Sequence, residues 1–137
     1  MNDRALRLVM AVLTLATVGI ATYLLQAHYS GASVACATGG CEIVQRSDYA
    51  ELVGIPVALL GLGAYLFLLG TAFFTTELAR TAAAGVAVAG AAFSAYLVYV
   101  QIAVIDAICQ WCVASDVIMV LLACACVARV VTAGRSD

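Results

Sequence analysis

The stretch LVMAVLTLATVGIATYLLQ at residues 8–26 contains no charged side chain, and Glu42 is the first charged residue after Arg7. A helix needs about 20 mainly apolar residues to cross the hydrocarbon core of a bilayer. This run is long enough and contains no proline. It therefore predicts a membrane-spanning helix at residues 6–27.

Three more apolar runs follow the first one. Charged side chains are absent from residues 52–76 and 81–105, and a last apolar run extends from near Cys109 to about Val131, with Asp116 near its start. The predicted helices are residues 56–75, 82–105 and 110–131. Together with the first helix, they predict an all-α, integral membrane four-helix bundle that forms one domain over residues 1–137.

The composition agrees with a membrane protein. Only 10% of the residues are charged and the mean hydropathy is +1.11, whereas a soluble domain usually has about 25% charged residues. The formal net charge of −2 gives no reason to expect a nucleic-acid partner.

The arginines predict the orientation of the bundle. Lysine is absent, and with four spans only Arg46 falls on one side of the membrane. The arginines on the other side are Arg4, Arg7, Arg80, Arg129 and Arg135. The positive-inside rule makes that side cytoplasmic. We therefore expect a plasma (inner) membrane protein with both termini inside and the first and third loops outside the cytoplasm.

The first apolar run also resembles a signal peptide, because it follows two arginines. The run ends near Leu25, however, well before Cys36. We therefore expect the first helix to be retained in the membrane rather than cleaved.

Four cysteines form two close pairs at the predicted outer ends of helices. Cys36 and Cys41 flank Ala-Thr-Gly-Gly, whose glycines permit a turn that brings the two Cα atoms to the roughly 5–6 Å of a disulfide. Cys109 and Cys112 have the two-residue spacing of thiol oxidoreductases, and the start of a helix stabilises a thiolate. Asp106 is the expected N-cap of that helix. Because disulfides form outside the cytoplasm, two facing pairs favour a redox relay.

Other readings of the cysteines stay open on the residues alone. Cys36 and Cys41 would also fit a permanent structural bridge, and the four outer thiols would fit a zinc site. His28, the only histidine, is expected in solvent at the start of the loop. No histidine follows Cys112, so the c-type haem signature is absent. Cys124 and Cys126 lie deep in the last helix, where we expect them to be small buried apolar residues.

Further candidates lie near the outer ends of the last two helices. Asp116 lies one turn after Cys112, and an ionisable side chain within a span is a candidate functional group. A protonated Asp116 would donate a hydrogen bond to a quinone carbonyl; the alternative is a solvated interfacial residue. Tyr96 and Tyr99 either line a quinone pocket or belong to an interfacial aromatic belt, and Trp111 is interpreted as an interface anchor.

The loop between the first two helices contains its own predicted element. Apolar residues recur at helical spacing over residues 42–53, which predicts a short helix lying on the membrane surface. Gly54-Ile55-Pro56 ends it and begins the second spanning helix.

The motifs that carry a family resemblance are Cys36 with Cys41, Ser47 six residues later, Gly54-Ile55-Pro56, Leu60-Gly61-Leu62-Gly63-Ala64-Tyr65 and Cys109-Gln110-Trp111-Cys112. This combination resembles the bacterial form of the vitamin K epoxide reductase family over nearly the whole chain. The resemblance implies a four-helix bundle around a quinone, either ubiquinone or menaquinone.

The same resemblance implies a role for each matching residue. Cys36 and Cys41 would be the loop pair that meets an external thiol partner, and Cys41 would then exchange with Cys109. Cys112 would be the thiolate next to the quinone, and Ser47 would line or support that pocket. Many bacterial members are fused to a thioredoxin-like domain. This chain ends without one, so the resemblance implies a separate thioredoxin-like partner of the DsbA type.

Two departures from the family bear on the reaction. Animal members that reduce vitamin K hold the head group with an asparagine in the second helix, and here the only asparagine is Asn2. They also have a tyrosine four residues after the last catalytic cysteine, where this chain has Asp116. Both departures argue against epoxide reduction, and neither affects the thiol relay.

The sequence therefore favours an enzyme, a membrane thiol:quinone oxidoreductase that sustains disulfide formation and needs no metal. The alternatives are a vitamin K or quinone epoxide reductase and a non-catalytic, metal-binding membrane scaffold. A protein of the DsbB type is disfavoured. In such a protein the two-residue-spaced cysteine pair lies in the first outer loop, whereas in this chain that pair opens the last helix.

Overall fold

The computed structural model describes residues 2–31, 35–36 and 39–136. The long helices are α1 (Asp3–Ser30), α3 (Val57–Thr71), α4 (Glu77–Tyr99) and α5 (Gln110–Ser136). The short elements are α2 (Cys41–Gln45), a 3₁₀ turn η1 (Asp48–Ala50), strands β1 (Glu51–Leu52) and β2 (Ile55–Pro56), and a π-helix η2 (Val100–Ile105) that continues α4.

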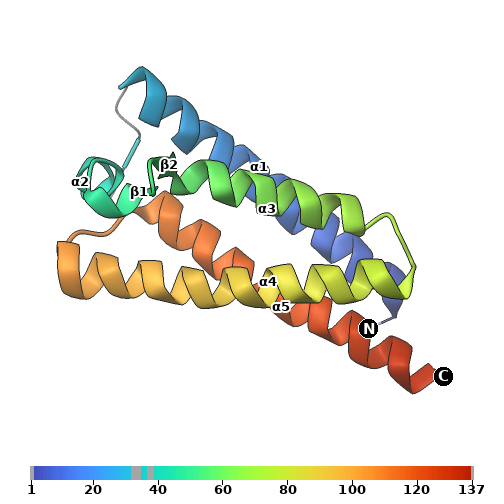
Figure 1. Cartoon of the computed structure of the whole chain (residues 1–137). Helices are drawn as coiled ribbons and strands as arrows, with labels where there is room; N and C mark the ends of the chain where they lie inside the picture. Colours follow the sequence, from blue (N-terminus) through green and yellow to red (C-terminus); the bar gives the residue numbers. More distant parts are fainter. Residues whose placement is uncertain (1, 32–34, 37–38, 137) are drawn as a thin grey trace.

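The four long helices pack side by side as a bundle (Figure 1). α1 contacts α3 and α5, and α4 contacts α3 and α5. The start of α1, the α3–α4 connection and the end of α5 lie at one end of the bundle (Figure 1). α2 and the β1–β2 hairpin lie at the opposite end, which also holds the first turn of α5. We call these the arginine end and the cysteine end.

Three of the helices are long and apolar enough to cross a membrane: α1, α4 with η2, and α5 up to Arg135. These three confirm the predicted helices, and each begins or ends a few residues beyond the predicted bounds. The helix predicted at residues 56–75 is shorter in the structure than in the prediction. Helix α3 has 15 residues and is only about 22 Å long. The hydrocarbon core is about 30 Å thick.

The loop before α3 differs from the prediction of one helix over residues 42–53. Helix α2 ends at Gln45, and the chain then forms η1 and the β1–β2 hairpin, in which Leu52 pairs with Ile55. The hairpin turns at Val53 and Gly54, whose φ angles are 54° and 80°. Positive φ at both central residues matches the twist of a two-residue hairpin. This backbone requirement overrode the helical spacing of the apolar residues.

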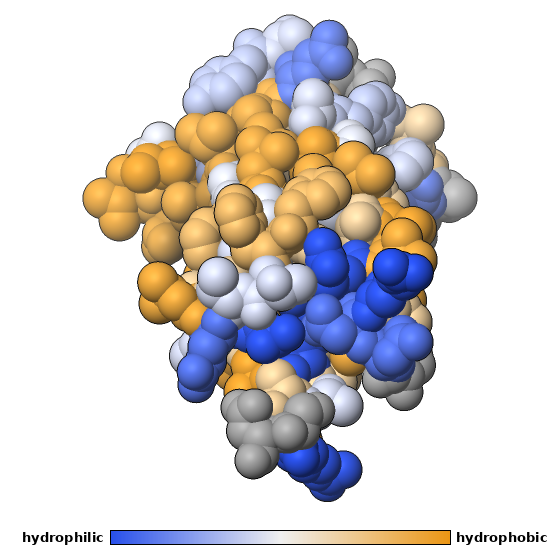
Figure 2. All heavy atoms as spheres, turned by 90° about the vertical axis from the view of Figure 1, so that its right-hand side faces the viewer, coloured by the Kyte–Doolittle hydropathy of each residue, from blue (hydrophilic) through white to orange (hydrophobic). Residues whose placement is uncertain are grey.

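At the arginine end, a buried charge ties three elements together. The Arg129 side chain of α5 is 1% exposed and donates from Nε to Oδ1 of Asp3 at 3.0 Å. Its Nη2 donates to the carbonyl oxygen of Phe74 in the α3–α4 connection at 3.0 Å. Figure 2 looks onto this end and shows hydrophilic residues gathered in a patch bordered by hydrophobic ones. Arg129 therefore joins α5 to α1 and to the α3–α4 connection.

Candidate functional site

A disulfide joins Cys36 and Cys41 at the cysteine end, with their Cα atoms 6.0 Å apart. Cys41 is the first residue of α2 and is fully buried, whereas Cys36 is half-buried. The half-buried partner is thus the sulfur of this pair that an external thiolate can reach more easily.

Cys109 and Cys112 lie at the start of α5 and are thiols in this structure. Cys109 immediately precedes the helix and is fully buried. Its carbonyl oxygen accepts the N–H of Val113 at 3.0 Å, and its Sγ accepts the N–H of Cys112 at 3.3 Å. A helix N-terminus and an amide donor both stabilise negative charge on a sulfur. Because Cys109 accepts both of these N–H groups from the first turn of α5, Cys109 itself occupies the N-cap position of that helix.

The prediction that Asp106 caps this helix was wrong. Asp106 ends η2 instead, with φ at 55°, and its N–H donates to the carbonyl oxygen of Gln101. Three residues separate it from α5, so its carboxylate lies outside the first turn.

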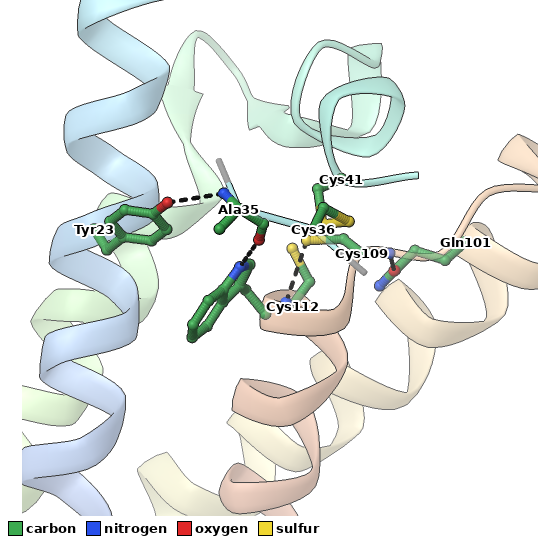
Figure 3. Close-up of a disulfide and its surroundings, with 8 residues drawn as sticks. Tyr23, Ala35, Cys36, Cys41, Gln101, Cys109 and Cys112 are labelled. Carbon is green, nitrogen blue, oxygen red and sulfur yellow. Dashed lines mark hydrogen bonds between the residues drawn. A yellow bond between two sulfur atoms is a disulfide. The ribbon is translucent and has the colours of Figure 1, made fainter. Parts of the chain in front are cut away.

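The two cysteine pairs meet in one apolar cluster. Cys36, Cys41, Cys109 and Cys112 all belong to the cluster that also contains Leu24 and Val44. Figure 3 shows the disulfide directly beside the two α5 thiols. The loop that carries the disulfide therefore packs against the start of α5.

Gly40 permits this close approach. A Cβ atom built on Gly40 would lie 2.6 Å from the carbonyl oxygen of Ile108 and 2.7 Å from its nitrogen. Both atoms are backbone, so they cannot move aside as the end of a flexible side chain would. Gly40 precedes Cys41 and Ile108 precedes Cys109, and so the missing side chain lets the two cysteine segments touch.

Gln101 holds the backbone of Cys109 from the other side. Its side chain is 2% exposed, and its Oε1 accepts the N–H of Cys109 at 2.8 Å. Its carbonyl oxygen accepts the N–H of Ala107 at 3.1 Å. Gln101 lies in η2, and π-helical turns often occur at functional sites. Sequence reasoning did not select Gln101, although a lone amide in a long apolar run was a signal.

A cavity of about 270 Å³ lies beside the cysteines, within the bundle. Its lining includes Cys112 and Asp116 of α5, Ser94 of α4, and Ser47 from the loop. The remaining lining is mainly apolar. The volume is close to the lower end of about 300 Å³ for sites that bind small ligands.

Asp116 is the notable polar group of the cavity. Its side chain is 93% buried, and its Oδ2 atom has no hydrogen-bond partner among the described residues. The neighbouring Ser115 is occupied, because its Oγ and its carbonyl oxygen both contact the Tyr65 hydroxyl, at 2.7 and 3.0 Å. A buried oxygen without a partner is costly, and a polar atom of a bound ligand would satisfy it.

The other sequence candidates divide between the cavity and the surface. Ser47 lines the cavity while its Oγ donates to the Val44 carbonyl oxygen at 2.7 Å. Tyr96 and Tyr99 lie on the outer face of α4, 49% and 62% exposed, and do not belong to the lining. Those positions agree with an aromatic belt rather than with a pocket.

Three residues lie in surroundings that the sequence did not predict. His28 lines the cavity and pairs with Glu51 at 3.1 Å, so it is not simply solvated. Trp111 packs against the loop, as described below. Cys126 is buried as expected, but Cys124 is exposed, because two residues along a helix point in different directions.

The chain was compared with models of protein families. The model of the vitamin K epoxide reductase family matches residues 8–127. The matched region contains both cysteine pairs and the residues that line the cavity. The chain belongs to the vitamin K epoxide reductase family.

Proposed function

We propose that this protein is a thiol:quinone oxidoreductase that reoxidises a separate thioredoxin-like protein of the DsbA type and passes the electrons to ubiquinone or menaquinone. Family membership and three apolar helices of spanning length indicate a multi-pass membrane protein with quinone-linked thiol chemistry. The observation that carries the finer proposal is the contact of both cysteine pairs in one cluster, with Cys112 also lining the cavity.

The first step takes electrons from the partner. A thiolate of the reduced partner attacks the Cys36 sulfur of the Cys36–Cys41 disulfide, and Cys41 leaves as a thiolate. Cys36 is favoured as the target because it is half-buried, whereas Cys41 is fully buried. The second thiol of the partner then attacks the mixed disulfide, which releases the oxidised partner and leaves both loop cysteines reduced.

The second step moves the electrons to α5. Cys41 attacks Cys109 of a Cys109–Cys112 disulfide, a Cys41–Cys109 bond forms, and Cys112 leaves as a thiolate. Cys36 then attacks Cys41, which re-forms the loop disulfide and releases Cys109. The products of this step are a loop disulfide and an α5 dithiol.

The third step uses the cavity. Cys112 opens onto it, and oxidation of the α5 dithiol to a disulfide supplies two electrons for reduction of the quinone. Asp116, buried and with Oδ2 lacking a partner among the described residues, is placed to hydrogen-bond a quinone oxygen. A mainly apolar pocket with few polar groups suits a quinone ring.

The proposed orientation places the cysteine end outside the cytoplasm in the plasma (inner) membrane. Five of the arginines lie in the first turns of α1, near the α3–α4 connection and in the last turns of α5. The positive-inside rule favours the cytoplasm for that end. Both termini then lie inside, and the loop disulfide lies where disulfides persist.

The alternatives receive less support. Asn2 caps α1 by accepting the N–H of Ala5, so it belongs to the arginine end and is remote from the cavity. Asp116 occupies the position of the tyrosine in animal members. Neither observation favours epoxide reduction. A structural zinc site would need the thiols that the loop disulfide occupies.

The test is quinone reduction by the purified protein in detergent, driven by a reduced DsbA-type protein or by a small dithiol. We expect Cys112→Ala to abolish turnover with both donors. Cys36→Ala should abolish turnover with the protein donor and retain it with the small dithiol. Cys124→Ala serves as the matched control, because this exposed cysteine lies outside both pairs. Turnover that is indifferent to Cys112, or absent with both quinones, would contradict the proposal.

A further inference from the structure

The backbone of Ala35, the residue before Cys36, is held by two aromatic side chains from different helices. The N–H of Ala35 donates to the Tyr23 hydroxyl of α1 at 2.9 Å. The Ala35 carbonyl oxygen accepts the indole N–H of Trp111 of α5 at 2.5 Å. The two rings touch each other edge to face, with centroids 5.4 Å apart. Figure 3 shows the Tyr23 hydroxyl directed at the Ala35 N–H.

The positions of these residues in the chain give the contact its meaning. Ala35 is adjacent to Cys36, and Trp111 lies between Cys109 and Cys112. The contact therefore links the backbone beside the loop disulfide directly to the turn that carries the α5 pair. Tyr23 connects both Ala35 and Trp111 to α1, a helix that contains no cysteine.

Building on the proposed function, we infer that Tyr23 and Trp111 form a clamp on Ala35 that positions the loop cysteines for exchange with Cys109. Neither clamp residue lines the quinone cavity and neither supplies a reacting atom, so they are positioning residues. They act on the step in which Cys41 attacks Cys109, the Cys41–Cys109 bond forms and Cys112 leaves.

The geometry explains why this step needs a clamp. The exchange requires the loop and α5 to hold two buried sulfurs within bonding reach, and a misplacement of about 1 Å can cost about 100-fold in rate. Gly40 permits the approach of the loop near Cys41 but does not itself hold the loop in place. Two hydrogen bonds to the backbone of Ala35, one from its N–H and one to its carbonyl oxygen, fix the loop near Cys36 together with the aromatic pair.

The variants that test the clamp are Tyr23→Phe and Trp111→Phe. Each keeps an aromatic ring and removes one hydrogen bond to Ala35. Tyr29→Phe is the matched control, because Tyr29 also lies on α1 and is 69% exposed. Tyr23→Phe is the more decisive variant, since Tyr23 lies outside the α5 motif.

The first measurement is the rate of Cys41–Cys109 bond formation. Cysteines 36, 112, 124 and 126 are replaced by alanine in the full chain, and diamide, which accepts two electrons, oxidises the remaining pair. The bridge is followed by blocking unreacted thiols and running non-reducing gels. We expect both clamp variants to form the bridge about three- to tenfold more slowly, as the loss of one hydrogen bond implies. The control should keep the parent rate.

The second measurement separates positioning from general damage. In a background with alanine at 36 and 41, a small dithiol reduces the α5 pair directly and drives quinone reduction. The clamp variants should keep this direct rate and the KM for quinone. Unchanged bridge formation, or an equal loss on the direct route, would overturn the clamp. Failure of the proposed function would give a different result, because the Cys112→Ala variant would then still reduce quinone. The bridge assay contains no quinone, so it would still test the clamp.

Discussion

At the scale of single residues, the site depends on Gly40, which has no side chain. Gly40→Ala places a Cβ within 2.7 Å of two Ile108 backbone atoms, so the loop must shift away from α5. We expect turnover with the protein donor to fall by about tenfold or more, since a small misplacement of reacting groups is costly. Direct reduction of the α5 pair by a small dithiol should persist.

The matched control for this prediction is Gly39→Ala. Nothing lies within 4 Å of a Cβ on Gly39, but its φ of 77° strains any side chain. Gly39→Ala therefore tests backbone strain without a clash at Ile108. An equal loss of exchange in both variants would show that the contact with Ile108 is not the cause.

Gln101 gives a second prediction at this scale. Gln101→Leu leaves the buried N–H of Cys109 without its acceptor, and we expect the unfolding free energy to fall by about 1–3 kcal/mol. Thiol alkylation should also report a changed reactivity of Cys109. Gln101→Glu keeps an acceptor oxygen at the same place and should retain the reactivity of Cys109 better than leucine does. Equal alkylation rates in the three proteins would argue against a role for this hydrogen bond.

At the scale of elements, Arg129 connects α5 to α1 and the α3–α4 connection. Arg129→Met removes the hydrogen bonds to Asp3 and to the Phe74 carbonyl oxygen. Breaking a fully buried pair costs about 3–5 kcal/mol. Asp3 is 34% exposed, so solvent screening should reduce the loss to about 2 kcal/mol. Thermal unfolding in detergent measures it.

Arg135→Met is the control for the Arg129 variant, because Arg135 is exposed in the last turn of the same helix. Its melting temperature should stay near that of the parent protein. A melting temperature of Arg129→Met equal to that of Arg135→Met would show that the buried network adds no stability.

At the scale of the whole molecule, the sequence predicted what depends on composition along the chain. Charge-free runs place the long helices, and cysteine spacing selects the two pairs. The shortness of α3 was missed because residues 72–76 are uncharged but lie outside the helix. The β1–β2 hairpin was missed because Val53 adopts a positive φ, which is rare for a β-branched residue.

The site contacts that the sequence did not predict depend on an irregular turn or on residues that are distant in the chain. Gln101 reaches Cys109 through a local π-helical turn, and Trp111 reaches Ala35 from 76 positions away in the chain. No periodicity or spacing encodes such contacts. Asp116 could be selected, by contrast, because a carboxyl group within an apolar run is unusual wherever it points.

The burial of Cys41 and Cys109 affects whether other thiols can compete with the exchange between these two residues. Both residues are fully enclosed, so in the proposed relay the bond between them forms out of reach of dissolved thiols such as glutathione. An electron pair that enters at Cys36 then has one exit, through Cys112. In the proposed relay, the packing around these two sulfurs keeps other thiols from intercepting the Cys41–Cys109 bond before the electron pair reaches Cys112.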